Sequence, residues 1–533
     1  MVKRIIRVVL LAVGSVVALF LLLAIALYIP PIQNFAVHKV AKYASEKTGM
    51  KLRVERVRLA FPLDLALINT FASQKGDTVV DARSVRVNVA LLPLFKSRVD
   101  VEGLEIYDSK INSVDFISDT QIKGRVGELK IRSHGIDLAN SLVNIDGGNL
   151  ADANITVLLS DTAKEDTTTK TPSVWKIRLK RFDLANSAVS LRFPGDSMRV
   201  SASVGSLSVK NGYFDLAENL YEVGHIGIRN TAATYDIPYE AYVKKLDPNH
   251  IAVTDFNADI DSLRYRAGAV RARLSGLSAK EKSGLTLNGM DGTLYVDSSK
   301  VELGGFKLKT PYSTLNATGV FAFNALKAGG EGAIKMKIDG EVDRRDITSV
   351  VPGGLGADVE KLLPEKPIGI SATLSGEKGN LRMENGKVAV AGMMQLRLDG
   401  RLKNITTDSR SGNLRYSLKT QNIDYLKKAL GLDSKSGINI PHGVSAYGTL
   451  KFSGDRYETN SRLLLGQGRA SVNGWFDTRR NAYSAKVSTV SVPLGKILEG
   501  SGLHSLTSQI SASGSGFDPF GKSMKMSAKA DFA

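Results

Sequence analysis

The strongest catalytic motif in the sequence is a phosphate-loop pattern near its end. The stretch from Gly516 to Ser523 reads GFDPFGKS, which satisfies G-x-x-x-x-G-K-[ST]. Such a loop holds phosphate when a helix follows it, because backbone N–H groups and the helix dipole then meet the anion. Met524 to Phe532 instead alternates as a strand does, and ten residues leave no room for a βαβ unit. We interpret the motif as a glycine-rich turn between two strands.

Other residue types that do chemistry are absent or scattered. The chain has no cysteine, which excludes thiol nucleophiles and Cys-ligated metals. Its carboxylate pairs, such as Asp259 and Asp261, fall on one solvated strand face. We therefore predict a protein that is not an enzyme, with no catalytic residue, metal or cofactor; an enzyme acting on envelope polymers stays an alternative without nominated carboxylates. The histidines lack metal-ligand spacing and are expected on the surface or in turns: His38, His134, His225, His250, His442 and His504.

Composition indicates many short strands joined by tight turns. Of 533 residues, 43% are hydrophobic and 23% are charged, as in a folded globular protein. Gly is abundant at 50 and Pro scarce at 15. Lys and Arg exceed Asp and Glu by 71 to 53, a net charge of +18. The basic residues occur singly among apolar ones rather than in an aromatic-interleaved stripe, so we expect no nucleic-acid partner.

The N-terminus predicts a membrane anchor. Val8 to Ile29 is an uncharged, almost wholly apolar run, long enough to cross a bilayer as a helix. A cleavable signal peptide is the alternative, but the run is too long and lacks an A-x-A-like site. Lys3, Arg4 and Arg7 precede it, so the positive-inside rule leaves the N-terminus in the cytoplasm and the bulk of the chain in the periplasm. We expect residues 1–29 to be a single-pass inner-membrane anchor.

Residues 30–49 predict an amphipathic helix. Ile32, Phe35, Val40 and Tyr43 lie near helical spacing, and Gly49 stands where the helix would stop. The helix lies on the membrane surface or plugs the next element in one interpretation, and packs on a sheet in the other.

From Lys51 onward, apolar residues recur at every second position, as in a β-strand, rather than at helical spacing. Runs of 4–8 residues, bounded by Gly, Asn, Asp or Ser, predict on the order of 40 strands, too many for one flat sheet. The sheet must therefore be long and curved. The apolar members of these runs are candidate lining residues of a groove: Val85, Val87, Val89, Leu91, Ile334, Met336, Ile338, Met394, Leu396, Leu398, Leu414, Leu418, Met524 and Met526.

Two interruptions suggest how the strands are organised. Residues 161–173 are polar and rich in Thr, Asp and Lys, which predicts a linker between a β region at 50–160 and repeated β modules at 174–533. Short helical patterns start at Asp346, Asp424 and Pro493, 78 and 69 residues apart. A period near 70 residues indicates a repeated sheet-plus-helix module.

Several stretches resemble the AsmA-like family. KLRVERVRLAFPLDL (Lys51–Leu65) and DARSVRVNVALLPLFKSRVDVEGLEIYDSKIN (Asp81–Asn112) look like the start of an AsmA-like protein. Leu285–Gly319 and Ala446–Asp477 are similar to repeats of its TamB group, the translocation and assembly module subunits, of the kind found in Bacteroides-like bacteria. TamB-like proteins are longer and end in a β-domain that meets an Omp85-type outer-membrane barrel. The resemblance therefore implies an N-terminal portion, or a shorter relative, without that docking region.

The resemblance also implies a fold and a function. AsmA-like proteins are similar to chorein-type bridge-like lipid transfer proteins, so we expect a mostly β chain whose curved sheet forms a taco-shaped groove with a few short helices. Such a groove would move phospholipid from the inner membrane to maintain the outer membrane. A closed β core would show the same alternation and stays open as an alternative. So does a scaffold that assists outer-membrane protein insertion or secretion through exposed strand edges.

Overall fold

The computed structural model describes residues 51–532 with several gaps, and the chain divides into two compact units. The first unit holds the described residues up to Tyr242 together with Pro248–Ala267. The second holds Val243–Asp247 and the described residues from Gly268 onward. The gaps are 61–63, 75–76, 90–100, 113–119, 138–140, 160–174, 423–441 apart from Asp424 and Lys427, 499–503 apart from Gly502, and 517–523.

The predicted membrane span, its flanking Lys3, Arg4 and Arg7, and the predicted helix at residues 30–49 lie outside the described residues. Within the described part of the chain, every helix is too short or too polar to cross a bilayer.

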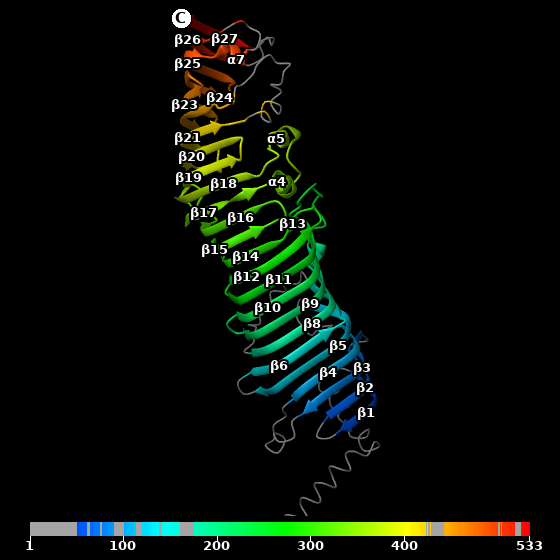
Figure 1. Cartoon of the computed structure of the whole chain (residues 1–533). Helices are drawn as coiled ribbons and strands as arrows, with labels where there is room; N and C mark the ends of the chain where they lie inside the picture. Colours follow the sequence, from blue (N-terminus) through cyan, green and yellow to red (C-terminus); the bar gives the residue numbers. More distant parts are fainter. Residues whose placement is uncertain are drawn as a thin grey trace, which may run out of the picture. The chain divides into compact units, whose positions relative to one another are not determined.

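The first unit is a sheet whose neighbours in sequence are mostly neighbours in space (Figure 1). Adjacent strands are antiparallel except that β6 and β7 both run parallel to β8. A single 3-10 turn, η1 (Pro194–Asp196), joins β8 to β9. The strands are β1 (Lys51–Ala60), β2 (Asp64–Gln74), β3 (Asp77–Val89), β4 (Val101–Asn112), β5 (Thr120–Asp137), β6 (Leu142–Ala151), β7 (Asn154–Leu159), β8 (Lys176–Arg192), β9 (Arg199–Asp215), β10 (Leu220–Asp236) and β11 (His250–Arg266).

A line of irregular residues, which we call the crease, crosses the first unit. An Asn or Asp with positive φ, a conformation these residues tolerate better than most, lies in each of β2, β4, β8 and β10 and between β6 and β7. Strands that neighbour these residues often supply a glycine. A Cβ atom at Gly127 would lie 2.8 Å from Asp152 Cβ, and one at Gly205 would lie 2.8 Å from the Asn230 carbonyl oxygen. The positive-φ residues of the crease are Asn69, Asp108, Asp152, Asn186 and Asn230.

Each positive-φ residue of the crease is followed by a small, buried one. Thr70, Ser109, Ala153, Ser187 and Thr231 are all at most 8% exposed, although none is large. The pairing register continues past these positions, as from Ala185 opposite Ser206 to Ser187 opposite Val204, so neighbouring strands change their side-chain alternation together. Small side chains fit the inside of the bend at the crease, where neighbouring positions converge.

The second unit is an antiparallel sheet in which β13 and β14 both pair with β12, and the strands from β14 to β27 then follow in sequence order. Short helices interrupt the strands: α4 (Arg344–Val350), α5 (Ala357–Lys361) and α7 (Leu494–Ile497). The strands are β12 (Ala269–Glu281), β13 (Thr286–Leu287), β14 (Gly289–Val296), β15 (Lys300–Lys309), β16 (Thr314–Ala322), β17 (Ala333–Val342), β18 (Ile368–Glu377), β19 (Asn380–Val390), β20 (Met394–Lys403), β21 (Ser411–Thr420), β22 (Ser445–Ser453), β23 (Arg456–Leu465), β24 (Gly468–Asp477), β25 (Ala482–Val492), β26 (Leu506–Ser515) and β27 (Lys525–Phe532).

The helical connections of the second unit recur every four strands along one edge. α4 and α5 follow β17, the gap at 423–441 follows β21, and α7 follows β25. The register places Val342, Ile368, Val390, Met394 and Thr420 side by side at this edge. The predicted period of about 70 residues thus corresponds to four strands and one longer connection. Of the second helical pattern, only Asp424 and Lys427 are described.

Helix α4 is held to the sheet by a buried polar network. Asp346 is 8% exposed and accepts hydrogen bonds from the hydroxyls of Thr310, at 2.6 Å, and Ser313. Asp343 caps the helix by accepting from the Arg345 backbone N–H at 2.9 Å. The Arg345 guanidinium donates to both oxygens of Asp343, at 2.8 and 3.1 Å, and covers the Tyr312 ring.

One expectation about organisation differs from the structure. The described strands number 27, and β5 and β8 to β11 contain 17 or 18 residues, because many Asn, Asp and Gly positions that predicted turns are bulges inside longer strands. The predicted linker at 161–173 lies outside the described residues. The strands on either side of it, β7 and β8, pair directly within the first unit.

The crease predicts unequal costs for two glycine substitutions. In Gly205→Ala, the new Cβ would lie 2.8 Å from the Asn230 carbonyl oxygen, so we expect a loss of about 1–3 kcal/mol in the free energy of unfolding. In Gly227→Ala, the nearest atoms would be at 3.4 and 3.5 Å, so stability should hold or rise slightly. Urea unfolding followed by circular dichroism measures both, and equal midpoints for the two variants would contradict the role of the crease.

The cap of α4 predicts a pH-dependent contribution. Hydrogen bonds from Arg345 hold the pKa of Asp343 below its ordinary value. A lowered folded-state pKa stabilises the fold above the unfolded carboxyl pKa, and this contribution disappears as pH falls through the folded value. Asp343→Asn should therefore cost about 1–2 kcal/mol at pH 7 and less at pH 3, below the unfolded carboxyl pKa. The control Asp408→Asn, at an exposed carboxylate, should leave the urea midpoint unchanged at both pH values, and a pH-independent loss in Asp343→Asn would refute the assignment.

Candidate functional site

One face of the second unit, here called its apolar face, is free of charge along the whole run of strands from β15 to β27. Directly paired residues of neighbouring antiparallel strands lie on the same face. Following these pairs across thirteen strands gives a central row of apolar or small residues. At about 4.8 Å per strand, the row extends roughly 58 Å along the sheet. The central row is Leu303, Gly319, Met336, Leu374, Met383, Gly400, Leu414, Leu450, Thr459, Gly474, Ala485, Ala512 and Ala528.

The candidate lining residues of the second unit fall on this face. Met336 and Leu414 belong to the central row, and the rows beside it also lack charged residues. Met524 immediately precedes β27 and has no strand partner. The remaining candidates lie in the neighbouring rows or at the helical edge: Ile334, Ile338, Met394, Leu396, Leu398, Leu418 and Met526.

The first unit has an apolar face of its own. Val85 pairs with Leu67 and Ile106, and Val87 pairs with Leu65 and Leu104, so both candidates lie among apolar neighbours. Val89 ends β3 opposite Val101, while Leu91 lies outside the described residues. In the longest strands the face continues through the bulges, as in β8, whose apolar-face residues are Ile177, Leu179, Phe182, Leu184, Ser187, Val189 and Leu191.

The apolar faces are only partly covered. Eighteen hydrophobic residues are buried among those described, and eight of them are alanine while none is aromatic. In a closed core, the largest apolar side chains would be the most buried. Here Leu396, Leu398, Leu414 and Leu418 all keep intermediate exposure. The faces are therefore open surfaces rather than closed cores.

A small core covers part of one edge. Ile334 is 2% exposed and Ala325 is fully buried in the connection between β16 and β17. Met336 and Leu381 complete this cluster, with Phe321, Leu326, Leu402 and Ile405 among the side chains packed against it. The cluster closes the sheet edge opposite the helical connections. It also buries Met336 of the central row, and Leu303 and Leu374 of that row pack against it, while the row from Met383 onward lies outside the cluster.

Hydroxyl groups on the apolar face bond to one another. The Tyr416 hydroxyl donates to Ser461 Oγ at 2.6 Å, and Thr459 shares a hydrogen bond of 2.6 Å with the same serine. Thr489 and Ser508 are paired at 2.9 Å. Because satisfied hydroxyls cost little to cover, an apolar ligand can lie over them.

Sequence reasoning missed most lining residues of the first unit. In β8 to β11 each bulge resets the alternation, so the apolar residues change from odd to even numbers and back. Stacked aromatic rings of Tyr221 and Tyr265, 5.4 Å apart, are part of this face. The signal that could have found them is an Asn or Asp followed by a small residue inside an apolar run.

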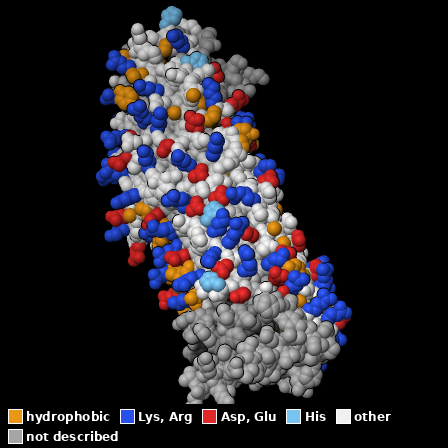
Figure 2. Space-filling view, turned by 60° about the horizontal axis from the view of Figure 1, so that its bottom comes forward, with side chains coloured by type: hydrophobic (Ala, Val, Ile, Leu, Met, Phe, Trp, Pro, Cys, Tyr) orange, Lys and Arg blue, Asp and Glu red, His pale blue; other side chains and the backbone are white. Residues whose placement is uncertain are grey.

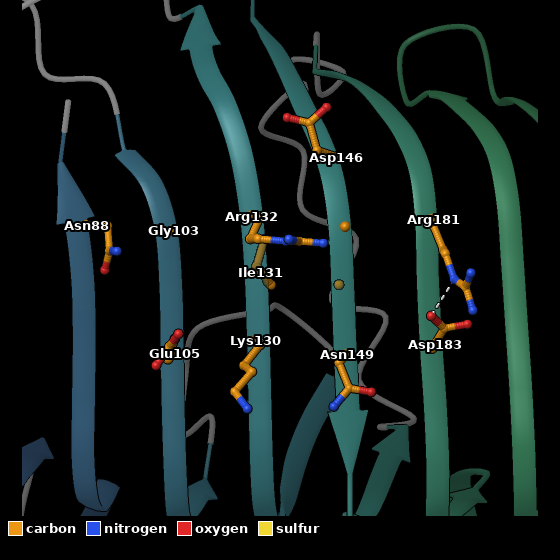
Figure 3. A pocket seen from close by; sticks show the side chains of 12 residues that line it. Asn88, Gly103, Glu105, Lys130, Ile131, Arg132, Asp146, Asn149, Arg181 and Asp183 are labelled. Carbon is orange, nitrogen blue, oxygen red and sulfur yellow. Dashed lines mark hydrogen bonds and ion pairs between the residues drawn. The ribbon is translucent and has the colours of Figure 1, made fainter.

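In each unit, the face opposite the apolar face is polar, and we call it the outer face of that unit. Figure 2 shows Lys and Arg side chains interspersed with Asp and Glu and only isolated hydrophobic ones. In the first unit it carries a depression of about 530 Å³ between two cross-strand rows, lined by Glu105, Lys130, Arg132, Arg181 and Asp183 among others (Figure 3).

Ion pairs neutralise much of this depression. Arg181 donates to Asp183 at 2.6 Å and lowers the pKa of that carboxyl. Lys180, at 2.5 Å, and His134, at 2.6 Å, both contact Asp146 and lower its pKa, the lysine being the larger cause. Carboxylates held in the charged form by their own partners are poor general acids or bases. Asp183 and Asp146 are therefore poorly suited to proton transfer.

The remaining residues singled out for chemistry are not assembled into a site. His225 contacts Asp261 at 2.8 Å, and Asp259 accepts two hydrogen bonds from Arg229 at 2.7 and 2.8 Å. His250 is 1% exposed, so the expectation of a surface or turn histidine is wrong there. Among the described residues, no group of three His, Asp or Glu could hold a metal ion. Of the phosphate-loop motif only Gly516 is described, and the strand predicted after it is β27.

The openness of the apolar face predicts how single cysteines react. The chain has no native cysteine, so one engineered thiol is unique. Leu398→Cys and Arg397→Cys stand on opposite faces of β20, and in delipidated protein both should react with a water-soluble maleimide within about tenfold of each other. Ile334→Cys, at a site 2% exposed, should react far more slowly. If Leu398→Cys is as protected as Ile334→Cys, the face is a closed core.

Comparison with known proteins adds no identification. No protein-family model matches the sequence, and no curated protein is significantly similar to it.

Proposed function

We propose that the protein is an inner-membrane-anchored, periplasmic lipid conduit that moves phospholipid along a β-groove to maintain the outer membrane. The observation that carries the proposal is the charge-free row of thirteen residues on the second unit, of which all but the buried Met336 are at least partly exposed. Each methylene group moved from water onto such a surface gains about 0.8 kcal/mol. A continuous row of equivalent positions lets an acyl chain slide without crossing a polar barrier.

The composition of the row supports transfer rather than storage. Aliphatic side chains make up most of the row from β15 to β22, and threonine, glycine and alanine make up the rest up to β27, so every position is apolar or small. The taco-shaped, chorein-like form of the sheet and the N-terminal anchor belong to the same proposal. They rest on the AsmA-like resemblance and on the apolar run at residues 8–29.

Photocrosslinking in cells tests the conduit. With p-benzoylphenylalanine at Leu398 or Leu414, on the apolar face, we expect covalent phospholipid adducts in the intact-mass spectrum of the purified full chain. The same probe at Arg397 or Arg415, one residue away and on the outer face, is the matched control and should capture little lipid.

The crosslinked species decides between the candidate functions. Lipid captured at the two apolar-face positions and not at the controls supports the conduit. Outer-membrane protein captured there in place of lipid favours the assembly scaffold, and adducts equally frequent on both faces contradict a lipid groove.

A further inference from the structure

The outer face of the second unit carries a stripe of cations without carboxylates, here called the basic row. Six consecutive strands, β17 to β22, each contribute one directly paired residue to it. Four are Lys or Arg and the other two carry neutral hydrogen-bond donors. At about 4.8 Å per strand the row is roughly 24 Å long. Its members are Lys335, Ser375, Arg382, Arg401, Asn413 and Lys451.

Two arginines of the basic row stand directly opposite each other. Arg382 of β19 pairs with Arg401 of β20, and like charges in this position destabilise a sheet. Arg382 has one ion pair, with Glu384 at 2.6 Å. Arg401 and the nearby Lys403 have none with any described residue. Positive charge without an ion pair to a described residue is therefore left on Arg401 and Lys403, whereas that of Arg382 is paired with Glu384.

A depression of about 620 Å³ opens between the basic row and the next outer row. Ser375, Arg382, Arg401 and Asn413 line one side of it. The other side is the paired series Glu377, Asn380, Lys403 and Ser411. Gly376, Leu381, Leu402 and Gly412 alternate with both rows, so their backbone forms the floor.

The chemistry of the lining suits an oxyanion. Three cations, two hydroxyls and two amides converge on the depression, against one carboxylate, Glu377. Glu377 lies opposite Asn380 in the second of the two rows, whereas Arg401 belongs to the basic row. A guanidinium presents parallel N–H donors that match two oxygens of a phosphate. In the first unit, by contrast, Lys130 and Arg181 of the outer depression are each ion-paired.

We propose that this depression binds the phosphate group of a phosphorylated ligand, with Arg401, Arg382 and Lys403 as its cationic contacts. The site lies on the outer face of the strands whose other face carries the apolar rows. It is therefore independent of the proposed conduit, and its failure would leave that proposal intact.

Calorimetric titration of the full chain in nonionic detergent, at constant ionic strength, tests the site with inorganic pyrophosphate. We expect saturable binding, and Arg401→Gln should raise the dissociation constant about 10- to 100-fold, as expected for loss of a charge-assisted hydrogen bond. Arg462→Gln is the matched control, because Arg462 is also exposed on the outer face, in β23, and has no ion pair with a described residue. Its dissociation constant should equal that of the parent.

A second readout separates binding from folding. Because Arg401→Gln removes a like-charge neighbour of Arg382, the Tm of the ligand-free variant should equal or exceed that of the parent. A lower Tm would mean that Arg401 is structural, and would overturn its assignment as a ligand contact.

Two further arms identify the source of the phosphate. Mixed micelles of the detergent with phosphatidic acid are compared with micelles containing phosphatidylcholine. Arg401-dependent binding of pyrophosphate supports a water-soluble phosphorylated ligand, whereas Arg401-dependent binding of phosphatidic acid micelles alone supports a lipid headgroup. Absence of binding in both arms, or binding that Arg401→Gln leaves unchanged, overturns the proposal.

Discussion

Cross-strand register is the constraint on which the rest of the structure depends. Side chains alternate between the two faces of a strand, so a slip of one residue would send its apolar residues to water. The second unit keeps thirteen strands in a register that leaves its central row without a charge. In the first unit, β8 and β9 keep their pairing register past Asn186, from Ala185 opposite Ser206 to Ser187 opposite Val204, so their apolar residues shift together. An unmatched bulge would break the apolar face.

Bending and openness follow from the same residues. Positive-φ Asn and Asp bend the strands, and small residues such as Ser109 and Ser187 occupy the inside of the bend. Those small residues become fully buried while larger side chains farther along the strands keep partial exposure. The most buried positions therefore mark where the sheet bends. Apolar side chains away from the bend remain available to a ligand, because no second layer of secondary structure is packed over them among the described strands.

The sequence predicted the second unit better than the first. Runs such as Ile334, Met336 and Ile338 alternate strictly, so period two alone places them on one face. The first unit defeats this reasoning, because Asn186 and Asn230 look like turn residues but lie inside 17-residue strands. The parallel pairing of β6 and β7 with β8 follows from long-range register, which local pattern does not contain. The depression beside the basic row could not be predicted from the sequence either, because its lining residues come from four strands, β18 to β21.

The two faces of the second unit are linked by that register. Leu381 and Leu402 pack in the small core on one face, and the residues after and before them, Arg382 and Arg401, meet on the other. Slipping β19 against β20 by one residue would separate the two arginines but would also carry Leu381 out of its core. Burial of the leucines therefore offsets the repulsion between the arginines. Any polar residue at the two positions would leave the leucine packing unchanged, so stability alone gives no reason for an arginine at both. Binding of the proposed anionic ligand gives such a reason.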